Sequence, residues 1–170
     1  MINRYLPFSL KKTLAVLMAL VFNFMLIGSA SAQQSGQKWH FGISADPATK
    51  KAHITLDLSG KLPDTVVFKM SVWTTGYYQF MNFGKSVSDF TATDESGKAL
   101  DFKHTDQNTW KVAANHKPVK LKYDVACIRN FVGGNFIDTG HAYFSPAGLF
   151  MYQDKNIIQP VSVTVNKYPG

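Results

Sequence analysis

Five histidines are the residues of this sequence that could hold a catalytic metal ion: His40, His53, His104, His116 and His141. A helix-borne zinc site needs two histidines about four positions apart, as in His-Glu-x-x-His, because that spacing puts both rings on one face of a helix. No two of these histidines lie within five residues of each other. The spacing excludes a helical zinc pair and leaves only a site assembled from distant strands. Ordinary strand and surface histidines are the favoured interpretation, and no cofactor is expected.

Nucleophilic catalysis finds no support either. The single cysteine, Cys127, cannot form an intrachain disulfide, and it lies in the alternating apolar stretch 121–128, which predicts a buried and inert thiol. There is no Gly-x-Ser-x-Gly elbow, and Gly133-Gly134 lacks the Lys-Ser/Thr of a phosphate loop, so it predicts a turn. The carboxylates fall mostly in turns or on polar strand faces. We therefore expect this chain to have no catalytic activity.

Residues 73–83 are the most unusual stretch, because they place five aromatic rings at the exit of an apolar strand. One interpretation is an exposed platform for a peptide, a glycan or a partner domain. The other is a hydrophobic plug on the end of a small domain that has no disulfide to stabilise it. The plug is favoured, with Trp73 buried. The candidate interface or binding residues are Trp73, Tyr77 and Tyr78 here, and Arg129, Asn135 and Asp138 in the loop 130–140 and just before it.

The candidate residues must be positioned by short segments that alternate apolar and polar residues or are rich in β-branched residues. Turn residues separate these segments, and helical periodicity is nearly absent. The pattern predicts an all-β fold, an antiparallel β-sandwich. Segments 39–58 and 87–104 predict hairpins, and 119–129 predicts a central strand with one solvated face. The expected strands are 39–45, 52–58, 65–73, 87–93, 99–104, 109–113, 119–129, 141–145, 149–153 and 161–165.

The first 32 residues have the pattern of a helical secretory signal peptide. Arg4, Lys11 and Lys12 precede an uncharged apolar run that ends before Ala30-Ser31-Ala32, a small-x-small cleavage sequence. The run is shorter than the roughly 18 residues that span a bilayer. We therefore predict a signal peptide at 1–32, one β-sandwich domain at 33–170, a periplasmic or secreted location, and no stable membrane anchor after cleavage.

The charge of the chain argues against nucleic-acid binding. Three of its 18 basic residues and none of its 11 acidic residues lie in the predicted leader. The remaining lysines are scattered among apolar and acidic neighbours and form no basic run.

The order of features from Trp39 to Gly170 resembles the N-terminal domain of the glycyl aminopeptidases, peptidase family sixty-one, which are thermolysin-like zinc enzymes. Residues 73–78, Trp-Thr-Thr-Gly-Tyr-Tyr, are similar to that domain's Trp-x-Pro-Gly-x-Tyr element, with Thr75 in place of the usual proline. Leu149-Phe150-Met151-Tyr152 is similar to its Leu-Phe-x-Tyr strand. Further segments that follow the family's order are 82–90, 94–100, 108–110, 123–125 and 129–142.

The resemblance implies a β-sandwich that packs on a catalytic domain carrying His-Glu-x-x-His, with Tyr168-Pro169-Gly170 as the junction toward it. We therefore expect a non-catalytic accessory domain, as a fragment or truncated product of a secreted peptidase. The alternative is a stand-alone periplasmic module that binds a peptide or a protein through the aromatic segment and the loop at 129–138.

Overall fold

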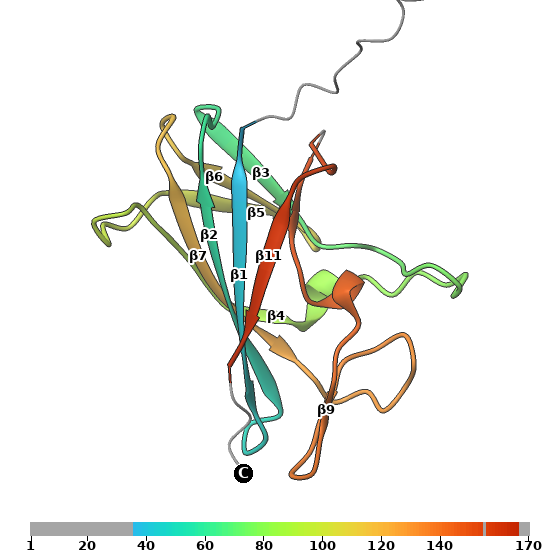
Figure 1. The fold of residues 1–170 in the computed structure, drawn as a ribbon. Helices are drawn as coiled ribbons and strands as arrows, with labels where there is room; N and C mark the ends of the chain where they lie inside the picture. Colours follow the sequence, from blue (N-terminus) through green and yellow to red (C-terminus); the bar gives the residue numbers. More distant parts are fainter. Residues whose placement is uncertain (1–35, 155, 167–170) are drawn as a thin grey trace, which may run out of the picture. The chain divides into compact units, whose positions relative to one another are not determined.

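Strands dominate the computed structural model, which describes residues 36–154 and 156–166 (Figure 1). All of them belong to the unit Ser35–Gly170. Residues that alternate between buried and exposed positions form its longest strands, as expected where one face of a sheet is covered and the other is solvated. The predicted all-β sandwich is confirmed.

Two sheets and a small ribbon make up the described part of the fold. The five-stranded sheet has the order β11 (Val161–Val165), β1 (Lys38–Asp46), β2 (Lys51–Ser59), β7 (Val119–Ala126) and β4 (Val87–Thr93). The four-stranded sheet has the order β10 (Tyr152–Gln153), β3 (Thr65–Lys69), β6 (Thr109–Ala113) and β5 (Phe102–Asp106). The ribbon pairs β8 (Phe136–Ile137) with β9 (Ala142–Tyr143), and short 3-10 turns form η2 (Phe83–Ser86) and η3 (Pro146–Gly148).

Aromatic rings join the two sheets across a common core. Trp39 of β1 meets Phe68 of β3 edge-on, with ring centroids 6.1 Å apart. Phe90 of β4 stacks across the sheets on Trp110 of β6 at 5.6 Å and, within its own sheet, on Tyr123 of β7 at 6.4 Å. Apart from the half-buried Phe90, these residues are almost fully buried. Face-to-face packing of this kind is what defines a sandwich.

Two of the three local predictions on strand pairing hold. The hairpin at 39–58 is confirmed as β1 and β2, in register from Lys38 opposite Ser59 to Asp46 opposite Lys51. The central strand predicted at 119–129 is confirmed over Val119–Ala126 as β7, which is paired on both sides and solvated on one face, and it ends three residues earlier than predicted.

The hairpin predicted over 87–104 is wrong, because β4 and β5 lie in different sheets. The turn after β4 is closed locally by Asp94, whose carboxylate accepts the N–H groups of Ser96 and Lys98. After a single bridge between Thr93 and Ala99, the chain crosses to the four-stranded sheet. An Asx turn of this kind suits a hairpin and a crossover equally well.

Several further strands differ from expectation: the strand predicted at 99–104 is Phe102–Asp106, that at 149–153 is only Tyr152–Gln153, and β8 lies in the predicted loop 130–140. The third strand ends at Lys69 instead of 73, where the chain leaves the sheet. The last strand, β11, pairs with β1 in parallel, whereas the other strand pairs in the described ranges are antiparallel. The predicted signal peptide and the junction at 168–170 lie outside the described residues. Within the part of the chain that is described, no helix is long and apolar enough to cross a membrane.

Candidate functional site

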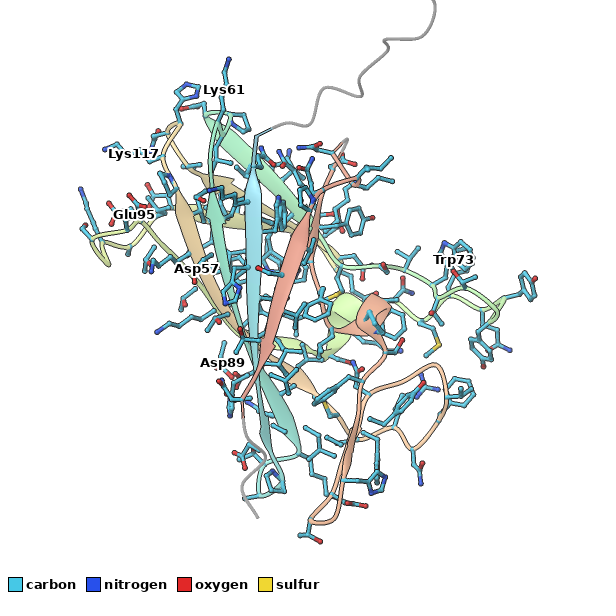
Figure 2. All side chains as sticks on the ribbon, in the orientation of Figure 1. Asp57, Lys61, Trp73, Asp89, Glu95 and Lys117 are labelled. Carbon is cyan, nitrogen blue, oxygen red and sulfur yellow. The ribbon has the colours of Figure 1, made fainter. Side chains whose placement is uncertain are left out.

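The aromatic loop, residues 70–82, leaves the sandwich after β3 and projects away from it (Figures 1 and 2). Backbone hydrogen bonds close its base: the N–H groups of Met81 and Asn82 both donate to the carbonyl of Val72, at 2.7 and 2.9 Å. At its tip the N–H of Tyr77 donates to the carbonyl of Thr74, and Gly76 has a φ of 84°. A positive φ at this position of a turn favours glycine. The loop is therefore a hydrogen-bonded ribbon.

The rings of the aromatic loop are largely exposed. Trp73 is 49%, Tyr78 94% and Phe80 82% exposed, and with Gln79 they line a hollow of about 330 Å³. The expectation of a buried plug is therefore wrong for Trp73, Tyr78 and Phe80, whereas Tyr77 packs partly buried against the core and Phe83 is buried in it. The physical reason is that other residues fill this end of the core, among them the fully buried Met70 and Met81 at the two ends of the loop.

A second loop, residues 128–145, contacts the aromatic loop. The ring of Tyr77 meets Phe131 edge-on at 4.9 Å between centroids. The guanidinium of Arg129 lies 5.6 Å from the centroid of Phe131, and its Nη1 lies 3.8 Å from Sδ of Met81. The structure thus brings Tyr77 and Arg129, two of the residues predicted from sequence, to one junction between the loops.

Asn135 lies behind this junction as a buried anchor. Its Nδ2 donates to the carbonyl of Gly148, its Oδ1 accepts the N–H of Ser145, and both distances are 2.8 Å. Its backbone carbonyl accepts the N–H of Arg129. With a side chain only 5% exposed and both amide groups in use, Asn135 positions the second loop.

Asp138 lies apart from the junction, in the turn between β8 and β9. Its Oδ1 accepts the N–H groups of His141 and Gly140, each at 2.8 Å, and the imidazole of His141 lies 3.1 Å away. The backbone hydrogen bonds from His141 and Gly140 lower the pKa of this carboxyl. Its oxygen closes the turn.

A groove of about 270 Å³ runs between η2 and the second loop. Its lining includes the exposed cations Lys85 and Arg129 above the buried Met81 and Phe83. Lys85 was missed by sequence reasoning, because a single lysine in Asn-Phe-Gly-Lys-Ser forms no pattern.

Comparison with known proteins identifies this architecture. A family model described as the peptidase M61 N-terminal domain matches residues 40–170. The chain belongs to this family. The resemblance seen in the sequence, which rested on residues 73–78 and the segments that follow them in order, is confirmed. No curated protein matches the sequence.

A solved structure agrees with the fold of the M61 N-terminal domain. It is that of an aminopeptidase N family protein from Idiomarina loihiensis, with a TM-score of 0.72 and 19% identity. The match covers 77% of this chain and 22% of that one. The M61 N-terminal domain described above thus corresponds to about a fifth of the length of that relative.

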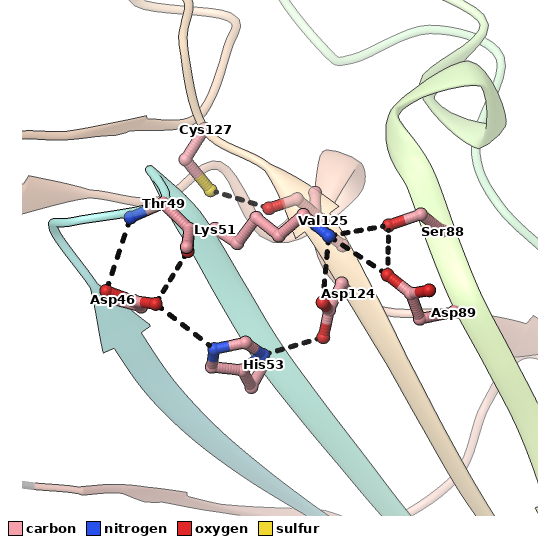
Figure 3. A network of polar contacts seen from close by, with 9 residues as sticks. All are labelled: Asp46, Thr49, Lys51, His53, Ser88, Asp89, Asp124, Val125 and Cys127. Carbon is pink, nitrogen blue, oxygen red and sulfur yellow. Dashed lines mark hydrogen bonds and ion pairs between the residues drawn. The ribbon is translucent and has the colours of Figure 1, made fainter.

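The outer face of the M61 N-terminal domain carries a separate polar network that joins four neighbouring strands (Figure 3). The ammonium of Lys51 donates to Asp89 at 2.9 Å and to Asp124 at 3.2 Å. His53 Nδ1 lies 2.7 Å from Asp124, and its Nε2 lies 3.8 Å from Asp46. Asp89 and Asp124 are thus paired with a cation of the domain itself, Lys51. Among the described residues, no group of three or more His, Cys, Asp or Glu side chains is arranged to hold a metal ion.

Replacing Lys51 by glutamine is expected to raise the pKa of Asp89. The hydrogen bond from Lys51 is the main cause that lowers this pKa. A carboxyl whose pKa is lowered by folding stabilises the fold at pH values above its ordinary pKa of about 3.9. This stabilisation is lost as the pH falls through the pKa of the folded state. A carboxyl-carbon NMR titration measures the change. Lys120→Gln is the control, because Lys120 pairs with Asp57 instead; an unchanged Asp89 in Lys51→Gln would contradict the assignment.

Cys127 of the M61 N-terminal domain is fully buried, and its Sγ donates to the carbonyl of Val125. Burial raises the pKa of its thiol to about 11. At pH 8 only roughly one thiol in a thousand would then be ionised, and the thiolate is the reactive form. We expect Ellman's reagent to react with Cys127 at least about a hundredfold more slowly in the native chain than in 6 M guanidinium chloride. Equal rates would show that the thiol is accessible.

Proposed function

We propose that this chain acts as a non-catalytic accessory domain that docks on the catalytic region of an M61-type zinc aminopeptidase. The family match over residues 40–170 supports the kind of partner. The fold relative supports the arrangement, since the matched part is a minor share of a much longer chain. We also propose that the chain is exported, on the basis of the leader pattern at 1–32.

The exposed aromatic loop is the observation that carries the docking proposal. Trp73, Tyr78 and Phe80 place large rings in solvent on a ribbon whose base and tip are hydrogen-bonded. Aromatic side chains on a rigid support are characteristic of the residues that contribute most to protein interfaces. Burial of three such rings against a partner would remove an apolar surface that the domain alone leaves uncovered.

The docking proposal is tested with the purified catalytic region of an M61 aminopeptidase. We expect a 1:1 complex of the two purified chains in size-exclusion chromatography with light scattering. Replacement of Trp73, Tyr78 and Phe80 together by serine should abolish the complex, whereas Phe102→Ser, at an exposed ring of β5, should not. The chain alone should hydrolyse no glycyl p-nitroanilide in the presence of zinc. A triple variant that still binds, or hydrolysis by the chain alone, would refute the proposal.

A stand-alone peptide- or protein-binding module is the second candidate. The junction of Tyr77, Arg129 and Phe131 favours it, because it joins an exposed aromatic surface to a fixed guanidinium. This function needs no catalytic region, so it would survive the failure of the docking experiment.

A further inference from the structure

We propose that the groove between η2 and the second loop binds an acidic peptide segment, with Lys85 and Arg129 as the residues that recognise its carboxylate. This inference deepens the second candidate function. It does not depend on docking through the aromatic loop, because the carboxylate is bound by Lys85 and Arg129 and not by the docking residues Trp73, Tyr78 and Phe80.

Arg129 is held in position before any ligand arrives. Its backbone N–H donates to the carbonyl of Asn135 at 3.1 Å, and its Cβ lies against Gly134, where an added Cβ would come within 2.9 Å. The guanidinium is further fixed by Met81 and Phe131. The thioether of Met81 is a weak acceptor, so most of the five N–H groups of the Arg129 guanidinium remain available to a ligand. With its planar fork of N–H donors, an arginine side chain matches the two oxygens of a carboxylate better than any other side chain does.

Lys85 supplies the second positive charge from a fixed backbone. The N–H of Gly84, next to it in η2, donates to Oδ1 of Asn108 at 2.9 Å. Asn108 in turn donates to Oδ1 of Asn82, the residue that precedes η2. Gly84 packs so closely on the backbone of Gln107 that no Cβ fits there, since an added one would lie 2.0 Å from the carbonyl oxygen. The position of η2 is therefore set by its contacts with the β5–β6 turn.

The charges of the groove are unbalanced in favour of an anion. No carboxylate pairs with Lys85 or Arg129 among the described residues, although seven ion pairs involving other side chains are present there. Among the described residues that line the groove, none is acidic. A negatively charged ligand would thus meet two cations without displacing an internal partner.

The lining points to a peptide in place of a free anion. Met81, Phe83 and Ala126 form an apolar floor, and Ile128, which is 67% exposed, forms part of the wall. An inorganic anion gains nothing from apolar surface, whereas a peptide with apolar residues beside its carboxylate buries them there. A volume of about 270 Å³ accommodates a few side chains and no larger ligand.

Fluorescence anisotropy with the purified full chain tests the proposal. The probe is a labelled heptapeptide in which two glutamates alternate with leucine and phenylalanine, and the matched control carries glutamine in place of both glutamates. We expect saturable binding of the acidic peptide and binding of the glutamine peptide that is weaker by about tenfold or more, as for the loss of a charge-assisted hydrogen bond. Backbone amide shifts of Ser86, Ile128 and Gly134 should change on titration.

Substitutions in the groove separate the proposed contacts from general effects. Arg129→Gln and Lys85→Gln should each weaken the peptide by about tenfold, whereas Lys61→Gln, at an exposed lysine elsewhere on the domain (Figure 2), should not. Thermal midpoints check that each variant folds, and Lys85→Gln leaves the Arg129 contacts in place. The proposal is overturned by equal binding of the two peptides, by groove variants that bind like Lys61→Gln, or by displacement of the peptide by an equal concentration of inorganic phosphate. The serine variant of the aromatic loop should retain peptide binding, so the failure of docking and the failure of this site are distinguishable.

Discussion

Replacement of Trp110 by alanine is expected to lower the free energy of unfolding by about 3 to 5 kcal/mol, the usual cost of deleting a buried aromatic ring. Trp110 is 2% exposed and lies between two rings: His104 stacks on it at 4.4 Å and Phe90 at 5.6 Å. It also pairs with Phe68 across β3 and β6. A small single domain has a total stability of only about 5 to 15 kcal/mol, so this loss removes a large share of it.

Trp73→Ala is the matched control for Trp110→Ala, since it deletes the same side chain from a half-exposed position. We expect it to cost less than about 1 kcal/mol, because solvent already reaches much of the ring in the folded state. Urea unfolding followed by far-UV circular dichroism measures both variants against the wild-type chain. Equal losses of stability, or a larger loss for Trp73→Ala, would mean that the aromatic loop folds back onto the sandwich.

The contrast between these two tryptophans shows which features of the fold are local enough to be predicted from sequence. Alternation of apolar and polar residues reports which face of a strand is buried, so the stretch containing Leu121, Tyr123 and Val125 was predicted correctly. The same rule worked for the first hairpin. Hydrophobicity alone could not predict whether Trp73 is buried. It indicates the free energy gained by burying the ring, but it does not indicate whether the core has room for it.

Sheet membership could not be predicted, because it depends on partners far away in the chain. β11 pairs with β1 across more than a hundred residues, from Trp39 opposite Val161 to Ile43 opposite Val165. Nothing in the valine-rich segment itself distinguishes a parallel from an antiparallel partner. The crossover between β4 and β5 has the same cause, since the Asp94 turn satisfies its hydrogen bonds locally whichever sheet follows.

The candidate site was predicted in part. Tyr77 and Arg129 were named from sequence and are brought to one junction, whereas Asn135 was named as a binding residue and positions a loop. Lys85 had no signal, because only the tertiary fold brings η2 to the same groove as Arg129. Binding sites that combine single residues from separate loops lack the spacing that makes a motif recognisable.

Replacement of Asn135 by alanine is expected to cost about 2 to 4 kcal/mol, because it leaves the buried N–H of Ser145 and the buried carbonyl of Gly148 without their partner. The loss of hydrogen-exchange protection near Asn135 should exceed the loss expected from the lower global stability alone. Ser145 donates its backbone N–H directly to Oδ1 of Asn135, so its amide should exchange with solvent at least about tenfold faster relative to the amides of β2. Asn130→Ala, at an exposed position of the same loop, should change neither quantity.

Urea unfolding and hydrogen exchange followed by NMR measure the two effects of Asn135→Ala separately. If the amide of Ser145 kept its protection while stability fell, another group would have to be its acceptor, and the anchoring role of Asn135 would be lost. If both effects appear, acidic-peptide binding should weaken as well, because the second loop that carries Arg129 would no longer be fixed against η3. Preorganisation of that loop is what lets a single exposed guanidinium recognise a carboxylate without first ordering its own backbone.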